Sequence, residues 1–371
     1  MSPRPRSKTP RHIARAIGPL AAALLLAGAT PCLAARWTWS GSGVVDFKGI
    51  HRVPDANELG KHGAIVEWSI KPNVEVSEKV SVTARLCTSC HGLTIDQAYA
   101  EVRLRREVNL EAGRINVPFG DYYQRHDPAS DALLSKPLPF EMGHMLRYQA
   151  TQFNLGVLPM PYVDSGATLF GDVWLGEALQ IWYGVFGANG FRSQNAQDFT
   201  FKDQVSTAGF EDNNDRLSWG GRLALARGEV TAGGSYLQGE YDPAAAYGYR
   251  AWGVDGSARL LGFQLRAEYL ERDTEVSDAG ARRTLEKKGF YGQIETPAWR
   301  KMSAAWRIDG LLREGPSLGT DNDVSSGILR WALCVSVAPA LEYSFRAQYE
   351  HWRFTDFADA DVVHVGLVVT Y

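Results

Sequence analysis

A two-residue alternation of apolar and polar side chains runs through most of this chain and limits its folds more than any other feature. Along residues 98–105, small or apolar side chains occupy the even positions and polar or charged ones occupy the odd positions. The two sets are Ala98, Ala100, Val102 and Leu104, and Tyr99, Glu101, Arg103 and Arg105. Such a period of two indicates a β-strand with one face toward an apolar phase and one toward water.

Long apolar runs do not accompany this alternation. After residue 35 no stretch of 18 apolar residues occurs, although 45% of all residues are hydrophobic and 11% are aromatic. The sequence therefore predicts no transmembrane helix in this region. It predicts an all-β fold, a transmembrane antiparallel barrel with lipid outside and a polar lumen inside. Two soluble β-sandwich domains are the alternative, but no linker or composition break divides the chain.

The alternating segments number about sixteen, and an even number suits a closed antiparallel barrel with both termini on one side. Short and long connections alternate between them, as periplasmic turns and extracellular loops do in outer-membrane barrels. The short connections are residues 77–79, 106–109, 176–178, 228–229, 262 and 339–340. The expected strands are residues 36–47, 64–76, 80–86, 94–105, 110–120, 164–175, 179–191, 216–227, 230–241, 250–261, 263–276, 289–298, 303–315, 327–338, 343–356 and 362–371.

The N-terminal segment has the form of an export signal. Basic residues precede the apolar run 19–28, and small residues allow cleavage after Ala34 or Ala35. We therefore expect a signal peptide over residues 1–35 and a barrel over residues 36–371. Removing the five basic residues of this segment changes the formal net charge from -3 to -8, which argues against a nucleic-acid partner.

Cys87, Cys90 and His91 carry the most specific chemical signal in the chain. Their C-x-x-C-H spacing is that of covalent c-type haem attachment, in which two thiols bind the porphyrin and the histidine binds the iron. The motif, at residues 87–92, caps a predicted hairpin on the rim with the long loops. A disulfide between the two cysteines is the alternative in an exported protein, and a zinc site would need ligands that the other cysteines do not supply.

A haem iron at this motif would need a distal ligand from another segment. Met142, His144 and Met145 are the candidates, because they lie together in one long irregular segment, residues 121–161. The alternative is that its methionines pack the segment against the barrel wall and its histidines are solvated. A loop of this length is usually functional, and we expect it to fold inward and constrict the channel.

Several arginines fall on the polar face of their predicted strands and are candidates for the pore lining. A ladder of them would favour anions. The alternative is that they pair with acidic neighbours such as Glu101, Glu268 and Asp309 and hold a hydrated interior. The candidates are Arg103, Arg105, Arg222, Arg266, Arg307, Arg330 and Arg346. Cys334 shares the polar face of its strand and is predicted to be unpaired.

The last strand alternates up to Tyr371, and this aromatic ending resembles the C-terminal signal of bacterial outer-membrane barrels. The stretch 112–120, followed by a long loop and by residues 164–167 opening a strand, is similar to the phosphate-selective porin family. The C-x-x-C-H motif also resembles that of fused outer-membrane cytochrome porins, which carry one haem. Their haem segment precedes the barrel, whereas residues 87–91 fall between the third and fourth strands.

Two classes of function follow from these features. The first is electron transfer at the outer membrane through one haem c, with a periplasmic or extracellular cytochrome as partner. The second is passive diffusion of small, including anionic, solutes, with Cys87 and Cys90 as a disulfide. Both place the chain in the lipid bilayer beside lipopolysaccharide, with a homotrimer as a candidate assembly. We expect no enzyme, because no hydrolase, phosphate-binding or metalloprotease signature is present.

Overall fold

The computed structural model describes residues 35–51, 62–89, 92–125, 127–140, 156–160, 162–192, 212–278, 280–316, 323–355 and 358–371. Within these ranges the chain forms sixteen strands and three short 3-10 helices. No helix in this part of the chain is long and apolar enough to cross a membrane.

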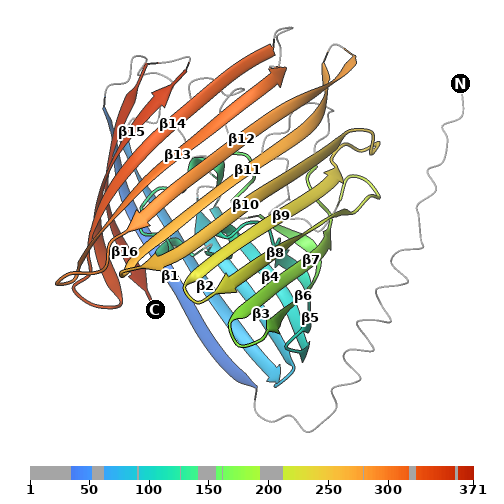
Figure 1. Cartoon of the computed structure of the whole chain (residues 1–371), viewed down its shortest axis with the longest axis horizontal. Coiled ribbons are helices and arrows are strands. Elements are labelled where there is room, and N and C mark those ends of the chain that lie inside the picture. The colour runs from blue at the N-terminus through green and yellow to red at the C-terminus, as the bar shows by residue number, and fades with distance from the viewer. Residues whose placement is uncertain are drawn as a thin grey trace, which may run out of the picture.

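The strands form one closed antiparallel barrel in which each strand pairs with its neighbours in sequence and β1 pairs with β16 (Figure 1). This arrangement confirms the predicted all-β, sixteen-stranded barrel. The strands are β1 Arg36–His51, β2 His62–Ser77, β3 Val80–Ser89, β4 Gly92–Arg105, β5 Val108–Asn116, β6 Val163–Leu175, β7 Leu179–Ala188, β8 Ser218–Arg227, β9 Val230–Glu240, β10 Gly248–Leu260, β11 Phe263–Asp278, β12 Ala281–Glu295, β13 Met302–Pro316, β14 Asp323–Val337, β15 Tyr343–Phe354 and β16 Ala360–Thr370.

Each strand presents one face outward and one inward. On β10, Trp252 and Val254 are 42% and 51% exposed, while their neighbour Ala251 is 1% exposed. The outer face is rich in exposed Trp, Leu, Val and Phe side chains, as a lipid-facing belt requires. The inner face carries most of the charged residues of the strands, and the two-residue alternation therefore sets the register of the whole sheet.

The barrel closes where the two ends of the chain meet. Val44 of β1 pairs with Val368 of β16 in a ten-residue ladder. Beyond that ladder, the hydroxyl of Tyr371 donates to the backbone carbonyl of Ser69 at 2.7 Å. The aromatic ending of the chain thus helps to close the seam between first and last strands.

Strand β12 is longer than the sequence predicts. We expected it to begin at residue 289 after a charged loop, but it begins at Ala281. Charge pairs between neighbouring strands explain the extension. Arg283 Nη1 lies 3.1 Å from Asp278 Oδ2, and Arg282 Nη1 lies 3.3 Å from Glu275 Oε2. Opposite charges on adjacent strands stabilise a hairpin that extends past the apolar belt.

The segment after β5 leaves the wall and enters the barrel (Figure 1). The fifth strand ends at Asn116, earlier than predicted, and Gly120 then adopts a positive φ of 63°. The segment contains η1 Tyr122–Arg125, η2 Pro128–Ser130 and η3 Leu138–Phe140. Asp127 caps η2 by accepting a hydrogen bond from Ala129 N at 3.2 Å. The described parts of residues 121–161 therefore fold inward, as their length predicts.

Candidate functional site

The inward segment, residues 117–125, 127–140 and 156–160, builds an apolar core inside the barrel. We call it the inner loop. Phe140 is fully buried, and its ring centroid lies 4.9 Å from the rings of both Tyr122 and Tyr123. Buried aromatic pairs of this geometry add to the free energy gained from burial alone. The inner loop is therefore held by a core like that of a soluble domain.

The barrel wall completes this core. On the loop's return to β6, Tyr162 packs 5.1 Å from Phe191, which stacks 4.5 Å from Tyr249 of β10. On β12, a Cβ at Gly289 would lie only 2.8 Å from the Pro139 ring. The loop thus packs closely against the wall at a glycine, where the wall has no side chain.

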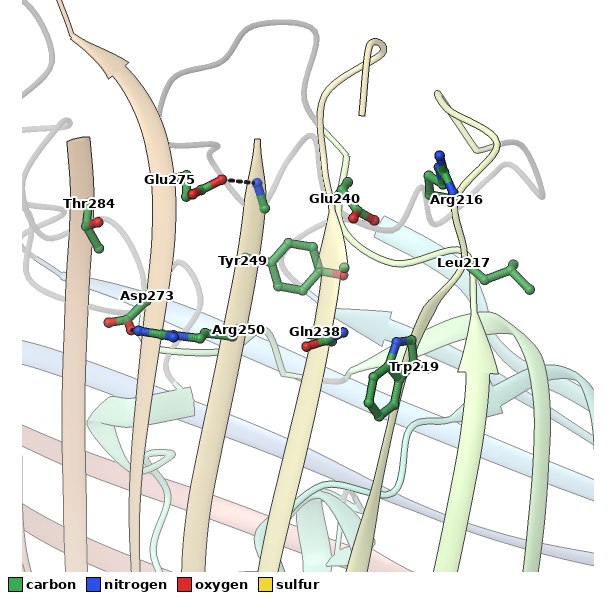
Figure 2. A pocket seen from close by; sticks show the side chains of 12 residues that line it. Arg216, Leu217, Trp219, Gln238, Glu240, Tyr249, Arg250, Asp273, Glu275 and Thr284 are labelled. Atoms are coloured by element: carbon green, nitrogen blue, oxygen red, sulfur yellow. Dashed lines mark hydrogen bonds and ion pairs between the residues drawn. The ribbon is translucent and has the colours of Figure 1, made fainter. Parts of the chain in front are cut away.

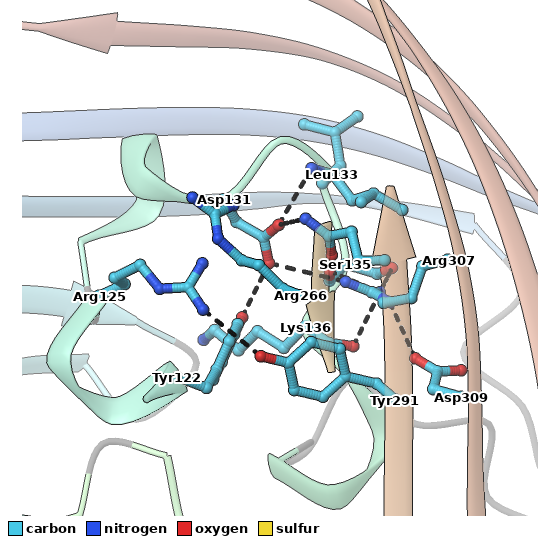
Figure 3. A network of polar contacts seen from close by, with 12 residues as sticks. Tyr122, Arg125, Asp131, Leu133, Ser135, Lys136, Arg266, Tyr291, Arg307 and Asp309 are labelled. Carbon is cyan, nitrogen blue, oxygen red and sulfur yellow. Dashed lines mark hydrogen bonds and ion pairs between the residues drawn. The ribbon is translucent and has the colours of Figure 1, made fainter. Parts of the chain in front are cut away.

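A buried charge network fixes the other side of the inner loop (Figure 3). Asp309 of β13 lies between two guanidinium groups, with Arg307 Nε at 2.9 Å and Arg330 Nη2 at 2.6 Å from Oδ2. The side chains of all three residues are at most 1% exposed. Arg307 Nη1 also lies 3.6 Å from Oδ2 of the loop residue Asp131. Burial of charges on this scale is tolerated only because each has an opposite partner.

Asp131 joins the inner loop to the wall through both its side chain and its backbone. Its carboxylate accepts a 2.9 Å hydrogen bond from the Tyr122 hydroxyl, and burial raises the pKa of that phenol well above its usual value. Its carbonyl accepts a 2.6 Å hydrogen bond from Arg346 Nη1 of β15. One residue therefore links η1, the loop backbone and two strands.

The network continues to the barrel seam through His364 of β16. Nδ1 of this histidine lies 2.8 Å from Asp46 Oδ2 of β1, and Nε2 lies 3.5 Å from Glu350 Oε2 of β15. Both ring nitrogens face carboxylates, which an imidazolium satisfies because both of its nitrogens donate. The seam and the inner loop are thus parts of one polar network.

The predicted pore-lining arginines all lie on inner strand faces or at strand ends, but most do not line an open path. Arg307, Arg330 and Arg346 are at most 8% exposed because the inner loop covers them. Arg222 Nη2 lies 2.6 Å from Asp255 Oδ2, and Arg266 pairs with Glu295. The prediction of an open arginine ladder is therefore corrected. The alternative of arginines paired with acidic neighbours fits these contacts.

Only two of the predicted arginines are exposed, and both lie near the end of β4. Arg103 Nε contacts Glu101 Oε1 at 2.8 Å, with 45% of its side chain exposed. Arg105 is the last residue of the strand. This end of the barrel carries the short turns, so these two side chains belong to the mouth of the lumen rather than to its constriction.

The cysteine motif is only partly within the described residues. Cys87 is a free, buried cysteine near the end of β3, whereas Cys90 and His91 lie outside the described residues. The candidate distal ligands Met142, His144 and Met145 lie outside them as well. Pairing of Ser89 with Gly92 leaves two residues between the strands.

A buried ion pair lies in the electrostatic surroundings of Cys87. Arg85 Nε and Asp96 Oδ2 lie 3.9 Å apart, with their side chains 6% and 7% exposed. The haem and its electron transfer stay a prediction, because Cys90 and His91 lie outside the described residues.

Mass spectrometry tests this prediction directly. The haem prediction expects the chain, expressed in cells that mature c-type cytochromes, to have the mass of its polypeptide plus one porphyrin. A variant with Cys87→Ser and Cys90→Ser is the control. A porphyrin increment in the unaltered chain that is absent from this variant would establish the haem, and the mass of the polypeptide alone in both would rule it out.

The second described cysteine, Cys334 of β14, is a free thiol that is 1% exposed. It packs in a small apolar cluster with Ala305, Ala332 and the loop residue Leu133. The prediction that it is unpaired and faces inward agrees with this position. Its thiol helps to seat the inner loop on β13 and β14.

The inner loop meets β1 and β2 differently from the other walls. A cavity of about 40 Å³ remains between them, bordered by Val44, Glu67 and Met160 among others. Polar contacts cross this side: Lys136 Nζ lies 2.9 Å from Glu67 Oε1, and Ser42 hydrogen-bonds to Asp127. These residues were missed from sequence, because no local motif marks a contact between a loop and a distant strand.

A second hollow lies at the strand ends away from the short turns (Figure 2). Its volume is about 510 Å³, and its lining includes Trp219, Tyr249 and Glu275 from β8, β10 and β11. Arg250 Nη2 pairs with Asp273 Oδ2 at 2.8 Å, and Gly248 N donates to Glu275 at 2.9 Å (Figure 2). The hollow is polar and lies at the rim of the barrel.

Comparison with known proteins identifies the fold. No family model and no curated protein matches the chain. Among solved structures, an anion-selective porin from Comamonas acidovorans is similar with 12% identity and a TM-score of 0.61, covering 91% of this chain and 100% of that one. Salmonella typhi OmpF in complex with daunomycin has 10% identity and a TM-score of 0.59, covering 90% of this chain and 97% of that one. Vibrio cholerae OmpT in its trimer form has 9% identity and a TM-score of 0.55, covering 91% and 100%.

These likenesses and the sheet topology define a porin-like fold: a closed, antiparallel barrel of sixteen strands. At identities of 9–12% they establish the fold alone. The resemblance of residues 112–120 and 164–167 to phosphate-selective porins stays a prediction.

Proposed function

We propose that the protein is a passive channel for small polar solutes across a bacterial outer membrane. One observation carries this proposal: a sixteen-stranded closed barrel has an exposed apolar outer face and a charged inner face. A barrel of this strand number is wide enough to leave an aqueous channel. The outer face suits a lipid bilayer, and the polar rim suits contact with lipopolysaccharide.

The inner loop sets the size of this channel. Its apolar core and its charge network occupy the interior along β7–β16, where inner-face residues such as Leu237, Leu270 and Ala332 are fully buried. Solutes must therefore use the part of the cross-section that the loop leaves free. We propose a narrow channel, and a homotrimer by analogy with the trimer form of OmpT.

Swelling of liposomes in solutions of neutral sugars tests this function. Reconstituted protein should let monosaccharides enter, and the swelling rate should fall steeply as the sugar becomes longer. Liposomes with heat-denatured protein are the control. Swelling no faster than in this control, for every sugar, would show that the barrel does not conduct solutes.

A further inference from the structure

The inner loop is held strongly to one side of the barrel and weakly to the other. Toward β13 and β14 its partners are charges whose side chains are at most 1% exposed, such as Asp309 and Arg330. Toward β2 its ion pair is Lys136–Glu67, whose side chains are 24% and 12% exposed. Pairs that water reaches contribute little to stability, whereas breaking a buried pair is costly. The Lys136–Glu67 contact at β2 is therefore the weaker of the two, although the Lys136 carbonyl itself accepts hydrogen bonds from Arg330 and Arg307.

The cavity lies on the same weak side. It separates the wall residues Val44 and Ile65 from the loop residues Leu133 and Lys136. At about 40 Å³ it holds a water molecule or two, not a solute. Displacing the Lys136 side chain would join this space to the lumen without disturbing the aromatic core around Phe140.

Charged residues of both signs lie where the inner loop faces β1 and β2, and most of them form ion pairs. Asp46 faces His364, Asp131 faces Arg307, and Arg125 Nη2 lies 2.6 Å from Asp121 Oδ2. Glu67 and Lys136 pair with each other at this side, and Asp127 and the exposed Lys71 lie within electrostatic range of one another. These two pairs carry no excess of either sign. Lys71 also lies within electrostatic range of Arg85, Glu101 and Glu111 on the neighbouring strands β3–β5.

We propose that the Lys136–Glu67 pair is a latch between the inner loop and β2, and that solutes pass at this latch. The passage favours small solutes that carry both charges or none, because a lining of one sign is what selects ions. This inference rests on the proposed channel function and names its path and its solute class. It replaces the expectation of an anion-selective arginine ladder.

Ion selectivity of single-residue variants tests the latch. In planar bilayers under a KCl gradient, the unaltered channel should show a reversal potential near zero. Lys136→Gln should shift it toward cations and Glu67→Gln toward anions. Both variants should also conduct about 2- to 5-fold more, because each breaks the same partly exposed pair.

A matched pair on the outer face provides the control. Lys288 and Glu286 of β12 also form an ion pair, with 32% and 28% of their side chains exposed. Lys288→Gln and Glu286→Gln should change neither conductance nor reversal potential. Migration of the unheated protein on a denaturing gel verifies that each variant is folded.

The outcomes separate the two proposals. One outcome is that the unaltered protein conducts while Lys136→Gln and Glu67→Gln shift the reversal potential in the same direction or not at all. This result would overturn the latch and leave the channel function standing. Strong selectivity of the unaltered protein for anions or cations would overturn the proposed solute class. Absence of conductance in the unaltered protein and in both variants would overturn the channel function itself.

Discussion

Replacing Phe140 with alanine should raise the ionic conductance of the reconstituted barrel several-fold. The ring is fully buried and packs 4.9 Å from both Tyr122 and Tyr123. Loss of a buried phenylalanine side chain costs about 3–5 kcal/mol. That cost falls on the docking of the inner loop, because the strands hold their own hydrogen-bonded ladders. Planar-bilayer recordings of single channels measure the change.

Phe345→Ala is the matched control for this experiment. Phe345 lies on β15 with 53% of its side chain exposed on the outer face, so the same truncation leaves the lumen intact. Its conductance should equal that of the unaltered protein. A folded Phe140→Ala variant with unchanged conductance would show that the aromatic core does not control the channel.

Removal of the Asp309 carboxylate should cause the largest loss of stability of any single charge change in the lumen. Asp309→Ala leaves Arg307 and Arg330 facing each other at 0% and 1% side-chain exposure without the anion between them. Breaking a buried pair in this way costs about 3–5 kcal/mol. It also removes the acceptor for Leu138 N, at 3.3 Å, and thereby loosens the loop.

Urea unfolding in detergent micelles, followed by tryptophan fluorescence, measures this loss as a lower midpoint. Asp273→Ala is the comparison, since its partner Arg250 has 68% of its side chain exposed. Exposed pairs contribute about 0.2–1 kcal/mol, so this variant should unfold close to the unaltered protein. Equal midpoints for the two variants would contradict the structural role of the buried network.

The barrel itself was predictable because its signal is local. Each strand repeats apolar and polar residues with a period of two, so the face of Trp252 or Ala251 follows from its position alone. Two strand ends differ from the prediction: β5 stops at Asn116, before the inner loop, and β12 starts earlier, so that Arg282 and Arg283 lie in a strand. Charge pairing with β11 stabilises that extension, and such pairing depends on a partner strand that local pattern does not include.

The interior was predictable only in part. The two-residue alternation predicted that Arg307 and Arg330 lie on the inner face, and the length of residues 121–161 predicted an inward loop. Neither signal indicates which wall the loop contacts. The loop residues that cover these arginines approach from more than a hundred residues away in sequence: Asp131 and Ser135 contact Arg307, and the Lys136 carbonyl accepts from Arg330. Such long-range contacts do not produce a repeating pattern in the sequence.

The cysteine motif is a strong local signal whose structural surroundings could not be predicted. Its spacing is a specific chemical signal, but a spacing says nothing of the surroundings in which the thiol lies. Cys87 lies beside the buried pair of Arg85 and Asp96. Whether a porphyrin fits depends on that neighbourhood as well as on the spacing.

Single-channel recording of the purified protein tests most directly the claim that this barrel is a narrow channel constricted by its inner loop. We predict discrete conductance steps for the unaltered protein, and larger steps when Phe140→Ala loosens the loop. Bilayers that show no steps with either protein, although both are folded and inserted, would contradict the account.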